Sequence, residues 1–355
     1  MADDIQNMTV GAVGRVQTAM RKPVIAILQG DPAGIGPELL VKLLNDDIRE
    51  ITNIVVLGDP EIFQRGERIV GRRVAGMRSI AKTEEIEFSE TGLLHLDIHI
   101  PGIAETALGQ VSAEGGRSSL EEMRMALELS QTTAVHGILF MPFNKASMYL
   151  GGNPFADEIG FARHFLGTTG AVSEFNVAHD MWNGRITSHV AMKDVPGMLT
   201  QSKIMDGIAL ADRTLRLAGY VHPRIAVAAY NPHAGEGGLL GREEIDIIAP
   251  AVKSMQERRV NVAGPFPADT LWLKMRDREY DVVVSMYHDQ GQIAIKLLGF
   301  DQGVSVLAGL PIPIATPAHG TAFDIAGQNK AKMTPTRNAF NMVVGMARHH
   351  LAAAE

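Results

Sequence analysis

The sequence predicts an α/β protein with mostly parallel sheets, and two observations support this prediction. Short runs rich in valine and isoleucine alternate along the chain with segments of helical periodicity. These runs are continuously apolar, which is typical of strands covered by helices on both faces. Strands that alternate with helices usually pair in parallel, because each helix returns the chain to the starting edge of the sheet.

The strands follow one another from the N-terminal part of the chain onward. Residues 23–29 (PVIAILQ) form an apolar run that ends at a glycine, and residues 37–45 then read as a helix. Gly58 and Pro142 end the next two expected strands, at 54–57 and 136–141. Later strands are expected at 174–178, 186–190, 225–230, 281–285 and 304–307. Helical periodicity is clearest at 202–218, 243–258 and 338–350.

The length of 355 residues allows one large domain or two ordinary ones. The glycine-rich stretch from Gly151 to Gly170 is where we expect the chain to change domain, with a return near Phe300. Residues 1–22 read as a polar N-terminal extension.

Composition excludes several classes of protein. The net charge of -7 disfavours a nucleic-acid reader, which usually shows a basic face. No apolar run reaches the length of about 18 residues that a membrane helix needs. The N-terminal segment lacks the apolar core of a signal peptide, so the cytoplasm is the expected compartment. The absence of cysteine excludes disulfides, thiolate metal sites and cysteine nucleophiles.

A glycine-rich turn, GDPAGIGPE at 30–38, lies between the first strand and the first helix. Glycines let a backbone turn sharply and approach a ligand, and a helix N-terminus favours negative charge. The spacing is not that of a Rossmann fingerprint, and a purely structural turn is the alternative. The candidate cofactor-binding residues are Gly30, Asp31, Gly34 and Gly36.

Three histidines lie at or just beyond the ends of expected strands: His189 in SH, His233 in YNPHAGEGG and His288 in MYHDQG. Ligands bind at strand ends in open α/β sheets. Three imidazoles with one open position favour zinc or another borderline transition metal over magnesium, which prefers oxygen ligands. Iron, cobalt, manganese and magnesium remain alternatives, as does an ordinary turn or core role for each histidine.

Residues 317–327 (PAHGTAFDIAG) form a loop of small residues with one acid. Such a loop can hold an adenosine, with the carboxylate of Asp324 bonded to the ribose hydroxyls, and this favours NAD over NADP. A tight turn capped by the aspartate is the alternative. The candidate cofactor-binding residues here are His319, Gly320, Thr321, Ala322 and Asp324.

Five motifs together resemble those of the 4-hydroxythreonine-4-phosphate dehydrogenase (PdxA) family. A more distant likeness to the isocitrate and isopropylmalate dehydrogenases lies in the turn and the adenosine loop. The resemblance implies a two-domain fold with the active site in the interdomain cleft, and a homodimer whose partner subunit completes that site. The motifs are GDPAGIGPE at 30–38, NPHAGEGG at 231–238, GPFPADT at 264–270, MYHDQG at 286–291 and HGTAFDIAG at 319–327.

The resemblance also assigns roles along the chain. It implies that His189, His233 and His288 hold the metal, although the segment around His189 reads SHVAM rather than the family's T-H-x-P. The implied domains are a cofactor-side domain of residues 23–150 plus 300–355 and a metal and dimerisation domain of residues 151–299.

Departures from the family bear on the substrate. The family's phosphate-binding G-H-T-E segment reads Asp157-Glu158-Ile159-Gly160, and Ser305 and Ile314 replace an asparagine and an arginine, while Lys296 is retained. Loss of the arginine removes a bidentate anion clamp, and a glutamate repels a dianion.

We therefore expect a carboxylated aromatic cis-dihydrodiol of the terephthalate type, oxidised with loss of carbon dioxide to a catechol. Ile159 and Ile314 would form an apolar wall for the ring, and Lys296 would meet the carboxylate. The alternative substrate is 4-hydroxythreonine 4-phosphate or a related phosphorylated hydroxy acid.

The expected chemistry is metal-assisted hydride transfer to NAD. A metal lowers the pKa of a bound hydroxyl, so that a base can remove its proton. Asp289 and Lys145 are the candidates for proton transfer, a solvated role being equally open for Lys145, and Asp269 is expected to orient a ligand. A metal-dependent hydrolase, which would leave the adenosine loop without a purpose, and a metal-stabilised binding protein are the rival classes.

Overall fold

Twelve strands form one continuous sheet in the computed structural model, which describes residues 22–44 and 46–354. The expected N-terminal extension falls almost wholly outside the described residues. The strand order is β3-β4-β2-β1-β5-β12-β11-β6-β7-β10-β8-β9. The strands are β1 Val24–Leu28, β2 Asn53–Gly58, β3 Arg78–Ile80, β4 Leu93–Asp97, β5 Gly137–Phe140, β6 Ser173–Ala178, β7 Met181–Arg185, β8 Ile225–Ala228, β9 Val262–Phe266, β10 Val282–Ser285, β11 Val304–Ala308 and β12 Ile314–Pro317.

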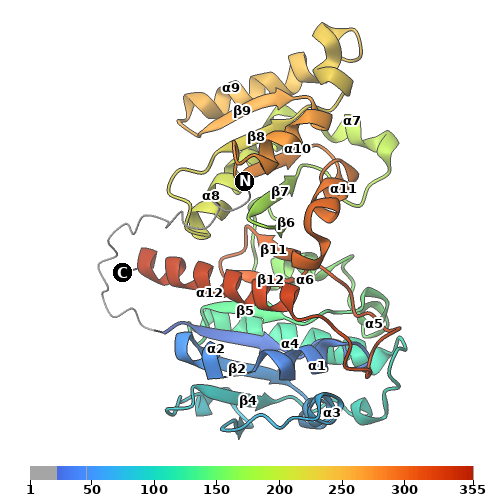
Figure 1. The fold of residues 1–355 in the computed structure, drawn as a ribbon, viewed down its shortest axis with the longest axis vertical. Helices are drawn as coiled ribbons and strands as arrows, with labels where there is room; N and C mark the ends of the chain where they lie inside the picture. Colours follow the sequence, from blue (N-terminus) through green and yellow to red (C-terminus); the bar gives the residue numbers. More distant parts are fainter. Residues whose placement is uncertain (1–21, 45, 355) are drawn as a thin grey trace, which may run out of the picture.

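The α/β class and the mostly parallel sheet are confirmed. Antiparallel pairing within the described strands is confined to the middle of the sheet, where β12, β11, β6 and β7 follow one another. Figure 1 shows these strands between a lower half built on β1 to β5 and an upper half built on β8 to β10. The sheet therefore consists of two parallel halves joined by an antiparallel centre.

Helices cover both faces of the sheet (Figure 1). Alternate residues of a strand point to opposite faces, so Ile25 and Ile27 pack with α1, α12, α8 and α9 in one core cluster. Ala26 and Leu28 pack with α4 on the other face, where α10 and α11 cover the upper half. The helices are α1 Gly36–Leu43, α2 Asp46–Ile51, α3 Pro60–Val70, α4 Ala113–Gln131, α5 Lys145–Leu150, α6 Glu158–Phe165, α7 Val195–Met198, α8 Gln201–Leu217, α9 Ala249–Glu257, α10 Ala268–Arg276, α11 His288–Gly299 and α12 Thr334–Ala354. Within this part of the chain, no helix combines the length and apolar character that crossing a membrane requires.

One strand prediction is wrong. The strand expected at 186–190 lies earlier, at Met181–Arg185, because two of its polar residues are paired inside the sheet. Asn183 accepts a hydrogen bond from Ser285 Oγ at 2.5 Å, and Arg185 is buried. Gly184 leaves room for a phenyl ring, since a Cβ there would lie 2.6 Å from Cζ of Phe175. The other predicted strands and helices lie within a few residues of their expected positions.

Helix α4 buries a carboxyl group beneath the glycine-rich turn. Glu122 accepts hydrogen bonds from the Gly30 backbone N–H at 3.0 Å and from Ser118 Oγ at 3.0 Å. Burial raises the pKa of the Glu122 carboxyl from an ordinary value near 4.5 to about 8. Glu122 therefore holds a proton at neutral pH in the folded protein.

This shift predicts how stability depends on pH. A carboxyl whose pKa is raised by folding contributes stability that is lost as the pH rises through its folded pKa. The free energy of unfolding is expected to fall between pH 4.5 and pH 8, by up to about 1.4 kcal/mol per pH unit. In Glu122→Gln, the slope of the free energy of unfolding against pH, measured by urea denaturation at each pH, is expected to be smaller, because an amide does not titrate. The control is Glu84→Gln, at an exposed position, and an equal change of slope in both variants would contradict the assignment.

Candidate active site

The three histidines follow three neighbouring strands. Strands β7, β10 and β8 are adjacent and parallel, so the segments that follow them leave the sheet at the same edge. His189, His288 and His233 lie in these segments. The rings of His189 and His288 are 5.5 Å apart between centroids and tilted by 40°. The structure thus brings two of the three predicted metal ligands together.

Two features of these imidazoles are compatible with a role as metal ligands. His288 Nδ1 lies 2.7 Å from Asp289 Oδ1, which is the outer hydrogen bond typical of a metal-ligating histidine whose Nε2 stays available. Burial, assisted by the charges of Lys145 and Arg185, lowers the pKa of His189, which favours the neutral, ligating form. Asp289 thus orients a ring, and it lines neither of the cavities described below.

The segment that carries His233 has an unusual backbone. Residues from His233 to Gly237 all have positive φ, including 52° at His233 and 54° at Ala234, which is the left-handed conformation that disfavours side chains. The carboxylate of Glu244, which is buried, holds the start of this segment. Glu244 accepts the backbone N–H groups of Tyr230 and Asn231 at 2.7 Å each and the Asn231 side chain at 2.9 Å.

The third histidine does not join the other two within a single chain. In the part of the chain that the structure describes, no three histidine or acidic side chains lie close enough to hold a metal ion together. His233 is exposed, and Asp269, on the first turn of α10, is exposed as well. Neither of them lines the two cavities in which the structure gathers several other predicted site residues.

Those two cavities, each of about 200 Å³, adjoin one another at the strand ends. Both are lined by Glu174, Ser305 and Ala318. We name the first the histidine cavity, and its other polar lining residues are Asn176, Arg185, His189, His288, Gln292 and Lys296. We name the second the lysine cavity, and its lining includes Lys145, Asp157, Glu158, Ile159, Thr316, His319 and Gly320.

Two helices begin in the lysine cavity. Lys145 is the first residue of α5, and Glu158 is the first residue of α6, which Asp157 caps through the Gly160 N–H at 2.9 Å. Burial raises the pKa of Glu158, as do Asp157 and Glu174, while Lys145 opposes the shift. Glu158 thus lies within the electrostatic reach of Lys145.

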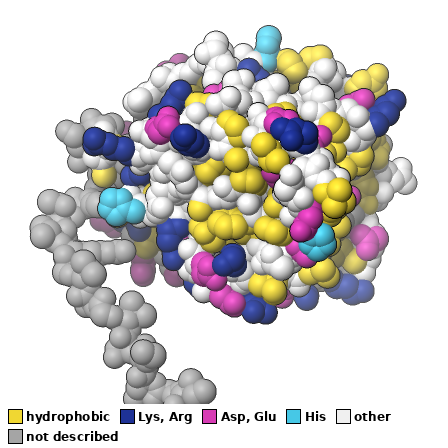
Figure 2. Space-filling view, turned by 90° about the horizontal axis from the view of Figure 1, so that it is seen from above, with side chains coloured by type: hydrophobic (Ala, Val, Ile, Leu, Met, Phe, Trp, Pro, Cys, Tyr) yellow, Lys and Arg dark blue, Asp and Glu magenta, His cyan; other side chains and the backbone are white. Residues whose placement is uncertain are grey.

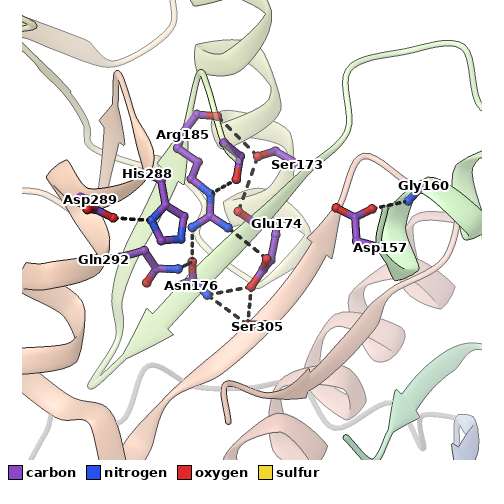
Figure 3. Close-up of polar contacts among 11 residues, drawn as sticks. Asp157, Gly160, Ser173, Glu174, Asn176, Arg185, His288, Asp289, Gln292 and Ser305 are labelled. Atoms are coloured by element: carbon purple, nitrogen blue, oxygen red, sulfur yellow. Dashed lines mark hydrogen bonds and ion pairs between the residues drawn. The ribbon is translucent and has the colours of Figure 1, made fainter. Parts of the chain in front are cut away.

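A buried arginine forms the centre of the polar network (Figure 3). Arg185 donates to Glu174 Oε2 at 3.0 Å, to Asn176 Oδ1 at 2.7 Å and to Ser188 Oγ at 3.0 Å. Its side chain is only 1% exposed, whereas that of Glu174 is 30% exposed. The Glu174 carboxylate is therefore more accessible from the cavities than the Arg185 guanidinium, which is almost fully covered.

Neighbouring side chains complete the network. Ser305 Oγ donates to Glu174 Oε1 at 2.7 Å, and Asn176 Nδ2 donates to the same oxygen at 3.0 Å. Gln292 Nε2 donates to Asn176 Oδ1 at 2.7 Å. Sequence reasoning found Ser305 but missed Glu174, Asn176, Arg185 and Gln292. For Glu174, Asn176 and Arg185, the signal available was a charged or amide residue inside a strand of a sheet covered on both faces, whereas Gln292 lies on α11.

The glycine-rich turn supports the loop of residues 317–327 rather than lining a cavity. Gly30, Asp31, Gly34 and Gly36 are all buried and line neither cavity, so the direct cofactor contact predicted for them stays a prediction. Asp31 Oδ1 accepts the Ala33 N–H at 2.8 Å within the turn itself.

The turn lies against Thr321, which positions the loop. The Ile35 N–H donates to the Thr321 carbonyl at 3.0 Å, and a Cβ on Gly34 would lie 2.9 Å from the Thr321 Cβ. Among the predicted loop residues, His319 and Gly320 line the lysine cavity, and Asp324 is exposed. Ala322 has a φ of 44°, a strained value that this close packing stabilises.

The substrate role predicted for Ile314 is also wrong. Ile314 is fully buried and pairs with Ile138 of β5, so it lines neither cavity. The Ile314 side chain therefore cannot form an apolar wall for a substrate ring, and its presence does not indicate which substrate the cavities bind. Ile159, Lys296 and Ser305, in contrast, do line the cavities, as predicted.

A family model described as pyridoxal phosphate biosynthetic protein PdxA matches residues 50–343. The chain belongs to the PdxA family. A Pseudomonas aeruginosa relative named "Putative 4-hydroxythreonine-4-phosphate dehydrogenase 2" is 49% identical over 92% of this chain and 98% of its own. The D-threonate 4-phosphate dehydrogenase of Salmonella typhimurium is 37% identical over 88% of this chain and 95% of its own.

Solved structures agree on the family and weigh against the predicted dihydrodiol. The 4-hydroxythreonine-4-phosphate dehydrogenase of Klebsiella pneumoniae is 36% identical, with a TM-score of 0.81 over 93% of this chain and all of its own. The terephthalate 1,2-cis-dihydrodiol dehydrogenase of Burkholderia xenovorans is 28% identical, with a TM-score of 0.66 over 92% of this chain and 98% of its own. The dihydrodiol enzyme is thus the more distant PdxA relative.

The anchoring role of Glu244 predicts a large effect of its removal. Glu244→Ala leaves two backbone N–H groups without their acceptor and is expected to lower the free energy of unfolding by about 2–4 kcal/mol. The control is Asp246→Ala, which removes only an exposed pair with Arg242 and is expected to cost about 0.5 kcal/mol. Chemical denaturation measures both, and equal losses would show that Glu244 is no anchor.

Proposed function

We propose that this protein is an NAD-dependent and divalent-metal-dependent dehydrogenase of a phosphorylated four-carbon hydroxy acid, of the 4-hydroxythreonine 4-phosphate or D-threonate 4-phosphate type. The observation that carries the proposal is one lysine in each of two adjoining cavities, with paired imidazoles beside them. Such a substrate has a carboxylate at one end and a phosphate at the other. Lys296 in the histidine cavity and Lys145 in the lysine cavity match these two anions.

The family supports this proposal over the dihydrodiol and the rival classes. Relatives that are 49% and 37% identical to this chain carry names of dehydrogenases of phosphorylated acids. Glu158, which suggested that a phosphate would be repelled, has a raised pKa and Lys145 nearby. The positive charge of Lys145 therefore offsets the repulsion of a dianion that the sequence implied for Glu158.

The histidine pair fits a divalent metal in its donor chemistry. His189 and His288 would hold the ion, with Asp289 fixing the second ring, and two imidazoles favour zinc among the candidate metals. The third ligand we assign to His233 of a second copy of the chain, because His233 is exposed and remote within one chain. When bound, the ion would polarise a substrate hydroxyl oxygen as a Lewis acid.

The chain's own residues would provide binding and proton transfer. Lys296 would hold one anionic end of the substrate, and Lys145, beside the other, would also exchange a proton with the substrate oxygen through Nζ. The loop around His319 and Gly320 would receive NAD, the hydride acceptor, with the exposed Asp324 toward the ribose. Oxidation at C3 of such an acid yields a 3-keto acid, a class of compound that readily loses carbon dioxide.

We also propose a homodimer formed through residues 151–299, leaving residues 23–150 and 300–355 as the cofactor side. Apolar side chains are exposed where the His233 segment contacts its neighbours, including Leu239 at 81%, Leu273 at 50% and Ile245 at 44%. Figure 2 looks onto the end of the molecule that carries α9 and β9, and hydrophobic side chains gather in the middle of that face. Exposed apolar patches of this kind support protein interfaces.

The activity predicts a clear assay result. The protein is expected to reduce NAD with D-threonate 4-phosphate or 4-hydroxythreonine 4-phosphate, and a chelator is expected to abolish the reaction until zinc or cobalt is restored. His288→Ala is expected to lower kcat/KM at least ~100-fold and to reduce bound metal, measured by mass spectrometry. His222→Ala, at an exposed position, is the control. Oxidation of a carboxylated dihydrodiol, with none of either phosphorylated acid, would reject the proposal.

The dimer makes a separate prediction. Leu239→Asp is expected to leave the fold intact, because this side chain is 81% exposed in the single chain. It is expected to raise the dimer Kd at least ~100-fold and to reduce activity in parallel, because it buries a charge in the interface. Light scattering after size exclusion gives the mass. Val221→Asp, 71% exposed near the opposite end of β8, is expected to stay dimeric, and a dimeric Leu239→Asp would contradict the assigned surface.

A further inference from the structure

The Glu174 carboxylate has a position shared by no other acid in the described chain, since it alone among acidic residues lines both cavities. It extends from β6 in the antiparallel centre of the sheet, with its side chain 30% exposed. A ligand that spans the two cavities therefore passes this carboxylate.

The hydrogen bonds of Glu174 leave one oxygen open. A carboxylate offers about four lone-pair sites, two on each oxygen. Oε1 accepts from Ser305 and Asn176, whereas Oε2 accepts from Arg185 alone. Oε2 can therefore accept one further hydrogen bond, from a donor in the cavities.

The charge of Glu174 is fixed by its surroundings. Burial would raise its pKa, but Arg185 and the hydrogen bonds from Ser305 and Asn176 outweigh burial, and Lys145 adds to their effect. The pKa of Glu174 lies below its ordinary value, so the group is a standing hydrogen-bond acceptor and a poor proton acceptor.

The balance of charge decides what kind of donor it accepts. Arg185 already neutralises Glu174, and Lys145 and Lys296 add two positive charges that balance the carboxyls of Asp157 and Glu158. An ammonium group would enter a site with no net negative charge to receive it, whereas a hydroxyl needs none. The two named substrates differ in this respect: 4-hydroxythreonine 4-phosphate carries an ammonium at C2, and D-threonate 4-phosphate carries a hydroxyl.

We propose that Glu174, held by Arg185, is the specificity-determining residue that accepts a hydrogen bond from the C2 hydroxyl of the substrate, and that Arg185 acts through it as a positioning residue. The pair selects a phosphorylated hydroxy acid over the corresponding amino acid. This assignment rests on the proposed function, and it gives a role to residues that the proposed function leaves unused.

The test compares kcat/KM for the two phosphorylated substrates. Wild type is expected to favour D-threonate 4-phosphate at least ~10-fold. Glu174→Gln is expected to lower kcat/KM for that substrate by about 10–100-fold, the value of a hydrogen bond to a charged group. Arg185→Gln is expected to shift the preference at least ~10-fold toward the ammonium substrate, because it leaves Glu174 without its counter-charge. Arg185→Lys, which keeps the charge, is expected to retain most of the preference.

The double variant Glu174→Gln/Arg185→Gln guards against loss of folding, because it removes both charges together and leaves neither unpaired. It is expected to lose the preference while NAD binding stays unchanged. A substrate ratio that stays at the wild-type value in these variants would overturn the assignment and leave the proposed function standing. If wild type oxidises neither phosphorylated acid, the proposed function fails and the assignment fails with it.

Discussion

The antiparallel pairing of β11 with β6 is the constraint on which the candidate site depends. It joins the two parallel halves of the sheet, and its register places Ser305 opposite Asn176 and Leu307 opposite Glu174. The polar network of the cavity wall is therefore built across the junction between the halves. A one-residue slip would turn every side chain of β11 to the other face and remove Ser305 from the carboxylate.

Around this junction, a few polar side chains provide most of one another's hydrogen bonds. Arg185 places three of its donors on Glu174, Asn176 and Ser188, so the one buried guanidinium organises residues of β6, of β7 and of the segment that leads to His189. Such a network is stable only when its members are satisfied together. It can therefore hold a carboxylate ionised at the edge of a cavity whose other walls include apolar side chains.

The sequence predicted the fold class and most elements, because continuous Val/Ile runs and turn glycines are local signals. Residues at strand ends, such as His288 and Lys145, were found for the same reason. Glu174 and Arg185 were missed because they lie inside strands, where a single sequence does not distinguish a paired charge from an exposed one. The direction of a side chain is a property of the tertiary structure, which is why Ile314 was assigned to the cleft when it lies in the core.

The contact between Gly34 and Thr321 has a consequence for how cofactor preference can evolve. Because a backbone hydrogen bond and a close approach fix the path of the loop against a distant part of the chain, most of its positions cannot change without disturbing the core beneath. Asp324 can be replaced without disturbing the core, because its side chain is exposed. If Asp324 faces the ribose of NAD as proposed, one surface substitution would change the preference for the adenosine phosphate on a scaffold whose geometry stays the same.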